Sequence, residues 1–83
     1  MNMKWERLTP SKLEWISPIL HRSVHVHDTV YETWSDDAFN VYYAHKEEKN
    51  YWSFYINNIW INSYKSFSDI KQIVVALNTN LRE

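Results

Sequence analysis

Four histidines are the side chains in this sequence best suited to metal or acid–base chemistry. His21 and His25 are four residues apart, a spacing that places two imidazoles on the same side of a helix. His27 and Asp28 follow directly, and three histidines with one carboxylate would make a legitimate tetrahedral zinc set. Because the chain has no Cys and lacks the glutamate of the helical zinc-protease motif, ordinary polar roles near a helix end are favoured. A metal site on the histidines stays an alternative, and we expect no cofactor.

Serines and carboxylates give little support to catalysis. Ser23, His25 and Asp28 could be written as a Ser-His-Asp set, but adjacency in sequence does not produce triad geometry. The chain contains 0 Gly, which excludes both the nucleophile elbow and the Gly-rich phosphate loops. The carboxylate pairs Asp36-Asp37 and Glu47-Glu48 fall in predicted exposed turns, where nothing would raise their pKa. The sequence predicts that the protein is not an enzyme.

Aromatic residues are the feature that points to binding. They make up 17% of the chain, with five Trp and six Tyr, which is more than one small core can hide. Exposed Tyr and Trp side chains mark contact surfaces, because they supply a large area at low entropic cost. We expect one face of the sheet described below to be aromatic, polar and almost uncharged, and to present a binding site made of Tyr42, Tyr51, Tyr55, Trp60, Asn62 and Tyr64.

The elements that must position these side chains form an α+β domain, which we interpret as a single unit over 1–83. Thr9-Pro10 predicts a helix start, and an apolar stripe of Leu13, Ile16, Leu20 and Val24 extends that helix over about 10–25. From Thr29 the hydrophobic period changes to two. This change predicts a four-stranded antiparallel meander over 29–34, 38–45, 51–56 and 59–65.

The turns between the predicted strands set the register of the sheet. Asn57-Asn58 predicts a two-residue hairpin turn, because Asn readily adopts positive φ where Gly is absent. That turn pairs Ile56 with Ile59, then Tyr55 with Trp60, Phe54 with Ile61, Ser53 with Asn62, Trp52 with Ser63 and Tyr51 with Tyr64. A charged four-residue loop over 46–49 would place Tyr43 opposite Trp52, Val41 opposite Phe54 and Phe39 opposite Ile56.

A C-terminal amphipathic helix follows the sheet. Ser66 and Asp69 have the spacing of a capping box, and one apolar face is formed by Phe67, Ile70, Ile73, Val74, Leu77 and Leu81. We expect this helix to pack on the sheet face that carries Phe39, Val41, Trp52, Phe54, Ile56, Ile59 and Ile61. The sequence leaves open whether the N-terminal helix covers the second, Tyr/Trp-rich face or leaves it free for a partner.

Charge and composition favour a protein partner. With 9 basic and 10 acidic residues and a net charge of −1, the chain lacks a basic footprint for nucleic acid. We therefore expect a non-catalytic protein-binding module whose partner is another protein or a second copy. The many Asn, Ile, Lys and Tyr indicate an AT-rich gene, which favours a small phage- or mobile-element-encoded inhibitor of a host protein.

The alternative is a nucleic-acid-binding module that stacks bases on the aromatic sheet. No apolar run reaches the length of a membrane span, and the N-terminus does not resemble a signal peptide. We therefore expect a cytoplasmic protein that does not contact a membrane.

Overall fold

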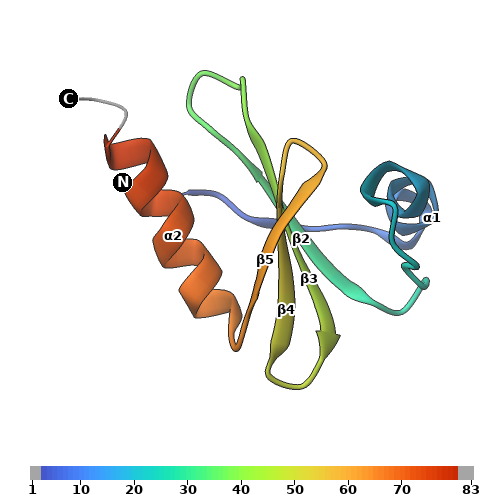
Figure 1. Ribbon diagram of the computed structural model, residues 1–83. Coiled ribbons are helices and arrows are strands. Elements are labelled where there is room, and N and C mark those ends of the chain that lie inside the picture. The colour runs from blue at the N-terminus through green and yellow to red at the C-terminus, as the bar shows by residue number, and fades with distance from the viewer. Residues whose placement is uncertain (1–2, 81–83) are drawn as a thin grey trace.

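A computed structural model describes residues 3–80 and has three layers, with an antiparallel sheet between two helices (Figure 1). This confirms the predicted α+β class. The elements in chain order are β1 Glu6–Arg7, α1 Pro10–Leu20, β2 Thr29–Trp34, β3 Val41–Glu48, β4 Tyr51–Ile56, β5 Ile59–Tyr64 and α2 Phe67–Asn80. The strands lie side by side in the order β1-β2-β3-β4-β5. The sheet therefore has five strands rather than the four expected, because the short β1 pairs with β2.

Helix α1 starts where the sequence predicts and ends earlier. Pro10 occupies the first turn, where its missing N–H costs no hydrogen bond. His21 then adopts the left-handed conformation, with φ 54°, and its backbone N–H donates to the carbonyl of Pro18. The predicted extension of the helix to residue 25 is therefore wrong. Val24 still packs against the same core as the helix, but it does so from the following loop.

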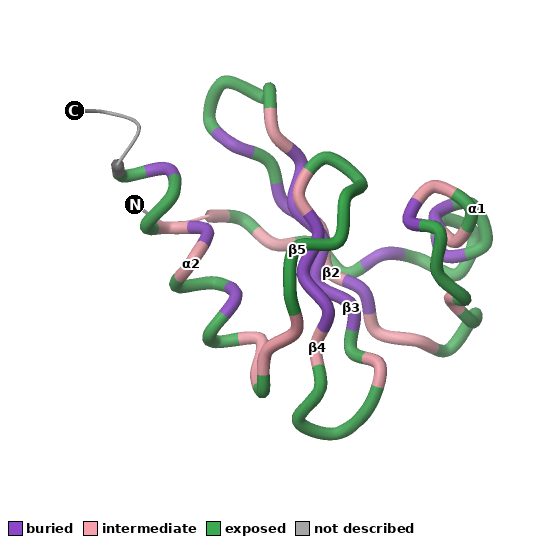
Figure 2. Tube along the Cα trace, viewed as in Figure 1, coloured by how far each residue is buried: buried purple, intermediate pink, exposed green. Residues whose placement is uncertain are grey.

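The two helices cover opposite faces of the sheet, here called the α1 face and the α2 face. On the α1 face, Leu13, Ile16 and Leu20 pack with a buried set made of Leu8, Val30, Val41, Tyr43 and Tyr55. On the α2 face, Ile70 and Val74 pack with Tyr42, Ala44 and Phe54, supported by partly buried side chains that include Trp52, Ile56 and Tyr64. β3 and β4 thus contribute to two cores, and both run buried through the centre of the molecule (Figure 2).

Helix α2 begins as its capping sequence predicts. The Ser66 Oγ accepts a hydrogen bond from the backbone N–H of Asp69 at 3.3 Å. Phe67 lies with its ring parallel to Tyr31 at 4.5 Å and to Trp52 at 5.1 Å between centroids, which fixes the first turn against the sheet. The predicted contribution of Leu81 lies outside the described residues.

The predicted register between β3 and β4 is wrong by three residues, since Tyr43 pairs with Tyr55 rather than with Trp52. The strands continue through the charged segment and turn at Lys49-Asn50, where Asn50 takes a positive φ of 59°. A bulge at Glu47 absorbs one residue, so Ala44 pairs with Phe54 and Tyr42 pairs with Ile56. Because a slip by an odd number of residues exchanges the two faces of a strand, Tyr42 lies on the α2 face and Val41 and Tyr43 on the α1 face.

The register between β4 and β5 starts as predicted and then shifts. Asn57 and Asn58 both have positive φ, 50° and 70°, and Ile56 pairs with Ile59 and Tyr55 with Trp60. Ile61 then forms a bulge, so the next pairs are Phe54 with Asn62, Ser53 with Ser63 and Trp52 with Tyr64. The pairs predicted beyond Trp60 are therefore wrong, and Asn62 and Tyr64 move to the α2 face.

Candidate binding surface

The six side chains predicted to share one binding face lie in three different environments. Tyr55 is buried beneath α1, Tyr42 is buried beneath α2, and Tyr64 is partly buried in the α2 core. The exposed members are Tyr51, Trp60 and Asn62. A single Tyr/Trp-rich face therefore does not form, because the bulges at Glu47 and Ile61 divide its members and α1 covers the centre of the second face.

An exposed apolar surface lies instead on β5. Ile59, Trp60 and Ile61 are 66%, 48% and 44% exposed, and we call these three consecutive residues the β5 surface. Figure 2 shows most of β5 as exposed, in contrast to the buried centres of β3 and β4. Sequence reasoning placed Ile59 and Ile61 in the core under α2. Ile59 keeps its predicted pairing with Ile56 but is exposed on the edge strand, and the bulge takes Ile61 out of its predicted pairing with Phe54.

The backbone of β5 adds hydrogen-bonding capacity to this surface. β5 is the last strand of the sheet, and the described residues supply no strand on its outer side. An edge strand carries outward-facing N–H and C=O groups that can pair with another strand. The segment 51–64, which forms β4 and β5, contains no acidic residue, no basic residue and no His. The edge therefore exposes apolar side chains and lacks the charged residues that usually prevent edge strands from pairing with another chain.

A depression of about 330 Å³ adjoins the β5 surface at the end of α1. It is lined by Leu20, His21, Arg22, Tyr55, Asn58, Ile59 and Trp60. The left-handed His21 brings the chain past the Asn57-Asn58 turn, so that the end of α1 and the β4–β5 hairpin share this depression. Each polar side chain that lines the depression can donate a hydrogen bond, and none of the lining residues is acidic.

Beside this depression, ionic side chains tie the loop after α1 to the sheet. Arg22 donates from Nε and Nη2 to the two carboxylate oxygens of Glu47, at 2.8 and 2.9 Å. Ser53 donates its hydroxyl to Glu47 as well, and the bulge on β3 is what turns Glu47 toward these partners. Six residues further along the same loop, Asp28 Oδ2 accepts from the backbone N–H of His25 and bonds His45 Nε2, both at 3.0 Å.

These contacts lower the pKa values of both carboxyl groups. The bond from Arg22 lowers the pKa of Glu47 most; burial opposes this, and Ser53 adds to the lowering. Burial favours the neutral form of Asp28, but the bonds from the His25 backbone and the His45 ring outweigh it, so its pKa also lies below the usual range. Both groups therefore favour folding in their ionised forms.

We expect acid to weaken the fold through Glu47. A carboxyl group whose pKa is lower in the folded state than in the unfolded state stabilises the fold. This contribution is complete at pH values above the unfolded-state pKa, about 4.3 for Glu, and disappears as the pH falls through the folded-state pKa. Wild type should therefore exceed Glu47→Gln in free energy of unfolding at neutral pH. Urea titrations at several pH values should show the difference shrinking below about pH 4. An undiminished difference in strong acid would contradict the assignment.

The histidines named as metal candidates do not converge. His21 lines the depression beside Trp60, His25 is exposed next to Asp28, and His27 is exposed on the far side of the same loop. Within residues 3–80, no group of three or more His, Cys, Asp or Glu side chains is arranged to hold a metal ion. The histidine that the structure does bury, His45, packs beneath the loop with its Nδ1 unpartnered by any described group.

No family model matches the chain, and no curated protein or solved structure matches it. Of the helices described, neither is long and apolar enough to cross a membrane.

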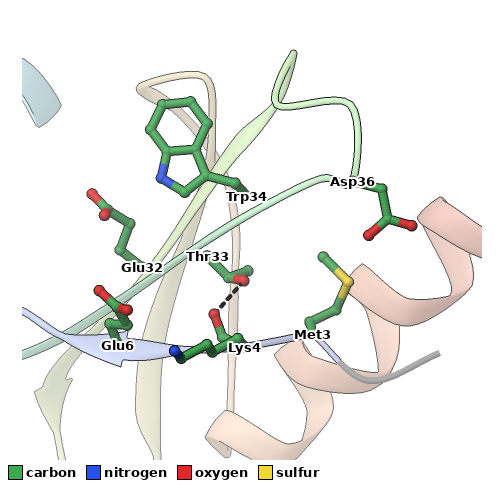
Figure 3. A pocket seen from close by; sticks show the side chains of 7 residues that line it. All are labelled: Met3, Lys4, Glu6, Glu32, Thr33, Trp34 and Asp36. Atoms are coloured by element: carbon green, nitrogen blue, oxygen red, sulfur yellow. Dashed lines mark hydrogen bonds between the residues drawn. The ribbon is translucent and has the colours of Figure 1, made fainter.

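A second depression, of about 360 Å³, lies at the opposite edge of the sheet. Figure 3 shows its lining side chains, which are Met3, Lys4, Glu6, Glu32, Thr33, Trp34 and Asp36. Glu6 and Glu32 are directly opposite each other in the β1–β2 register, and Thr33 Oγ1 donates to the backbone carbonyl of Lys4 at 2.7 Å. Like charges in such a pair are mutually unfavourable. This edge is short and charged, the reverse of the β5 edge.

Proposed function

We propose that the protein is a non-catalytic protein-binding module that holds its partner through the β5 surface. The observation that carries this proposal is the run Ile59-Trp60-Ile61, which gives three exposed apolar side chains on an edge strand that has no charged residue. Solvent exposure of such a run disfavours a monomer and is relieved when a partner covers it. Trp60 is the central anchor, because a partly exposed indole beside a depression is the geometry typical of interface hot spots.

Charge supports a protein partner over nucleic acid. A surface that binds nucleic acid needs Arg and Lys beside its aromatic side chains to meet the phosphates. The β5 surface carries neither, and the nearby Arg22 is engaged by Glu47. The amino-acid composition indicates an AT-rich gene, which favours a phage or mobile element as the source. A protein that inhibits a host protein needs a binding surface but no catalytic group.

We expect Trp60→Ser to abolish most of the binding. Affinity capture from the native host, followed by mass spectrometry and measurement with the purified partner, should show a loss of about 2 kcal/mol, roughly 30-fold in Kd. Trp15→Ser is the matched control, because Trp15 is 67% exposed on the outer side of α1, away from β5. The control should bind as wild type does.

A partner retained equally by both variants would show that the β5 surface is not the site. Binding that depends on nucleic acid in the extract and falls steeply with salt would favour the alternative function, because counterion release gives a strong salt dependence that an apolar contact lacks.

A further inference from the structure

We propose that a second copy of this chain occupies the β5 edge, so that the β5 strands of two copies pair antiparallel about a two-fold axis. The inference rests on the proposed function, since it uses the β5 surface and names its partner. The two edges of the sheet differ sharply: β1 has two residues, both charged, whereas β5 has six, all uncharged. Only the β5 edge offers a strand long enough for a stable pair.

Charge favours self-association at this edge. Two copies of a charged strand would place like charges opposite each other or leave charges unpaired, and either arrangement is unfavourable. Because the segment 51–64 has no charged residue, two β5 strands can meet without repulsion in any antiparallel alignment. The backbone groups of an edge are self-complementary by nature, since each strand brings both donors and acceptors.

The bulge at Ile61 selects one alignment. Residues opposite each other in an antiparallel pair point to the same face of the sheet. Ile59 and Tyr64 are five residues apart and would ordinarily point to opposite faces, but the bulge brings both to the α2 face, as their partners Ile56 and Trp52 show.

The same shift places Trp60 and Ser63 together on the α1 face. An alignment that sets Ile59 against Tyr64 therefore also sets Trp60 against Ser63. Ile59 then meets an aromatic ring, and the Trp60 indole gains room over the small Ser63 side chain. Ile61 of each copy then lies opposite Asn62 of the other copy, and the two Ile61 residues are on either side of the axis. The dimer is one continuous sheet, with both copies of α1 on one face and both copies of α2 on the other.

The test is sedimentation equilibrium of the full chain over a wide concentration series, with a charge placed on the edge. Ile61→Lys puts a lysine where natural edge strands carry one, and the two lysines of the dimer would lie close together on either side of the axis. Val26→Lys is the matched control, because the side chains of Val26 and Ile61 are both 44% exposed. Val26 lies in the loop before β2 and so does not belong to the β5 edge. Circular dichroism checks that each variant is folded.

We expect wild type and Val26→Lys to form dimers with the same Kd, and Ile61→Lys to raise that Kd about tenfold or more. If Ile61→Lys does not fold, Ser63→Lys replaces it, since it sets a lysine against Trp60 of the other copy. A wild type that stays monomeric throughout, or a folded edge variant that dimerises as tightly as wild type, overturns the inference. Monomeric wild type with Trp60-dependent capture of another protein refutes the dimer alone and leaves the proposed function standing.

Discussion

Phe54→Ala is expected to leave the protein unfolded or close to it. Phe54 is 1% exposed and packs between the sheet and α2, beside Tyr42 and Ile70, so its truncation should cost about 3–5 kcal/mol. A chain of 83 residues is held by roughly 4–12 kcal/mol in total, so the loss is comparable to the whole stability. Urea unfolding followed by circular dichroism measures it.

Phe39→Ala provides the control for this variant. The sequence placed Phe39 on the same covered face as Phe54, but its side chain is 81% exposed in the loop between β2 and β3. Its truncation should change the free energy of unfolding by less than about 0.5 kcal/mol. Comparable effects of the two truncations would show that the α2 face is assigned wrongly.

Tyr55→Ser and Trp60→Ser should separate burial from binding. The two residues are directly paired across the β4–β5 hairpin, yet Tyr55 is 1% exposed under α1 and Trp60 is 48% exposed. We expect Tyr55→Ser to lose about 3–5 kcal/mol of stability and Trp60→Ser less than about 1 kcal/mol. Thermal and urea unfolding of the two variants compares them directly.

Tyr55→Phe tests which part of the side chain matters. The Tyr55 hydroxyl is buried without a well-formed hydrogen bond to a described residue, so removing it while keeping the ring should cost less than about 1 kcal/mol. A large loss in Tyr55→Phe would mean that the hydroxyl has a partner after all. A Trp60→Ser variant that unfolds outright would identify Trp60 as a core residue and remove the basis of the β5 surface.

Secondary structure was readable from the sequence wherever one local signal dominated. The bounds of β2 and β4 match the predicted 29–34 and 51–56, and α2 begins after the predicted Ser66 cap. The Asn57-Asn58 turn was predictable, because few residues other than Asn and Gly adopt positive φ easily. Each of these signals lies within a few residues of the element it defines.

The faces of β3 and β5 were not predictable, because each depends on a bulge. The charged segment from Lys46 to Lys49 resembled a solvent loop, yet Glu47 is held in the strand by Arg22, 25 residues away in the sequence. The bulge at Ile61 has no Gly or other local marker. When a bulge is missing from a predicted register, every later side chain is assigned to the wrong face. The residues predicted to form one binding site therefore lie on two faces and at an edge of the sheet in the structure.

The double-sided packing of the central strands divides the chain into positions that can vary and positions that cannot. Five consecutive residues of β3, Val41–His45, are all buried, because alternate side chains enter the two cores. Natural variation that preserves the fold is thereby directed to the outer sides of the helices and to β5. The sequence of the β5 surface can drift without disturbing either core, so descendants of this protein could exchange one partner for another while keeping the same scaffold.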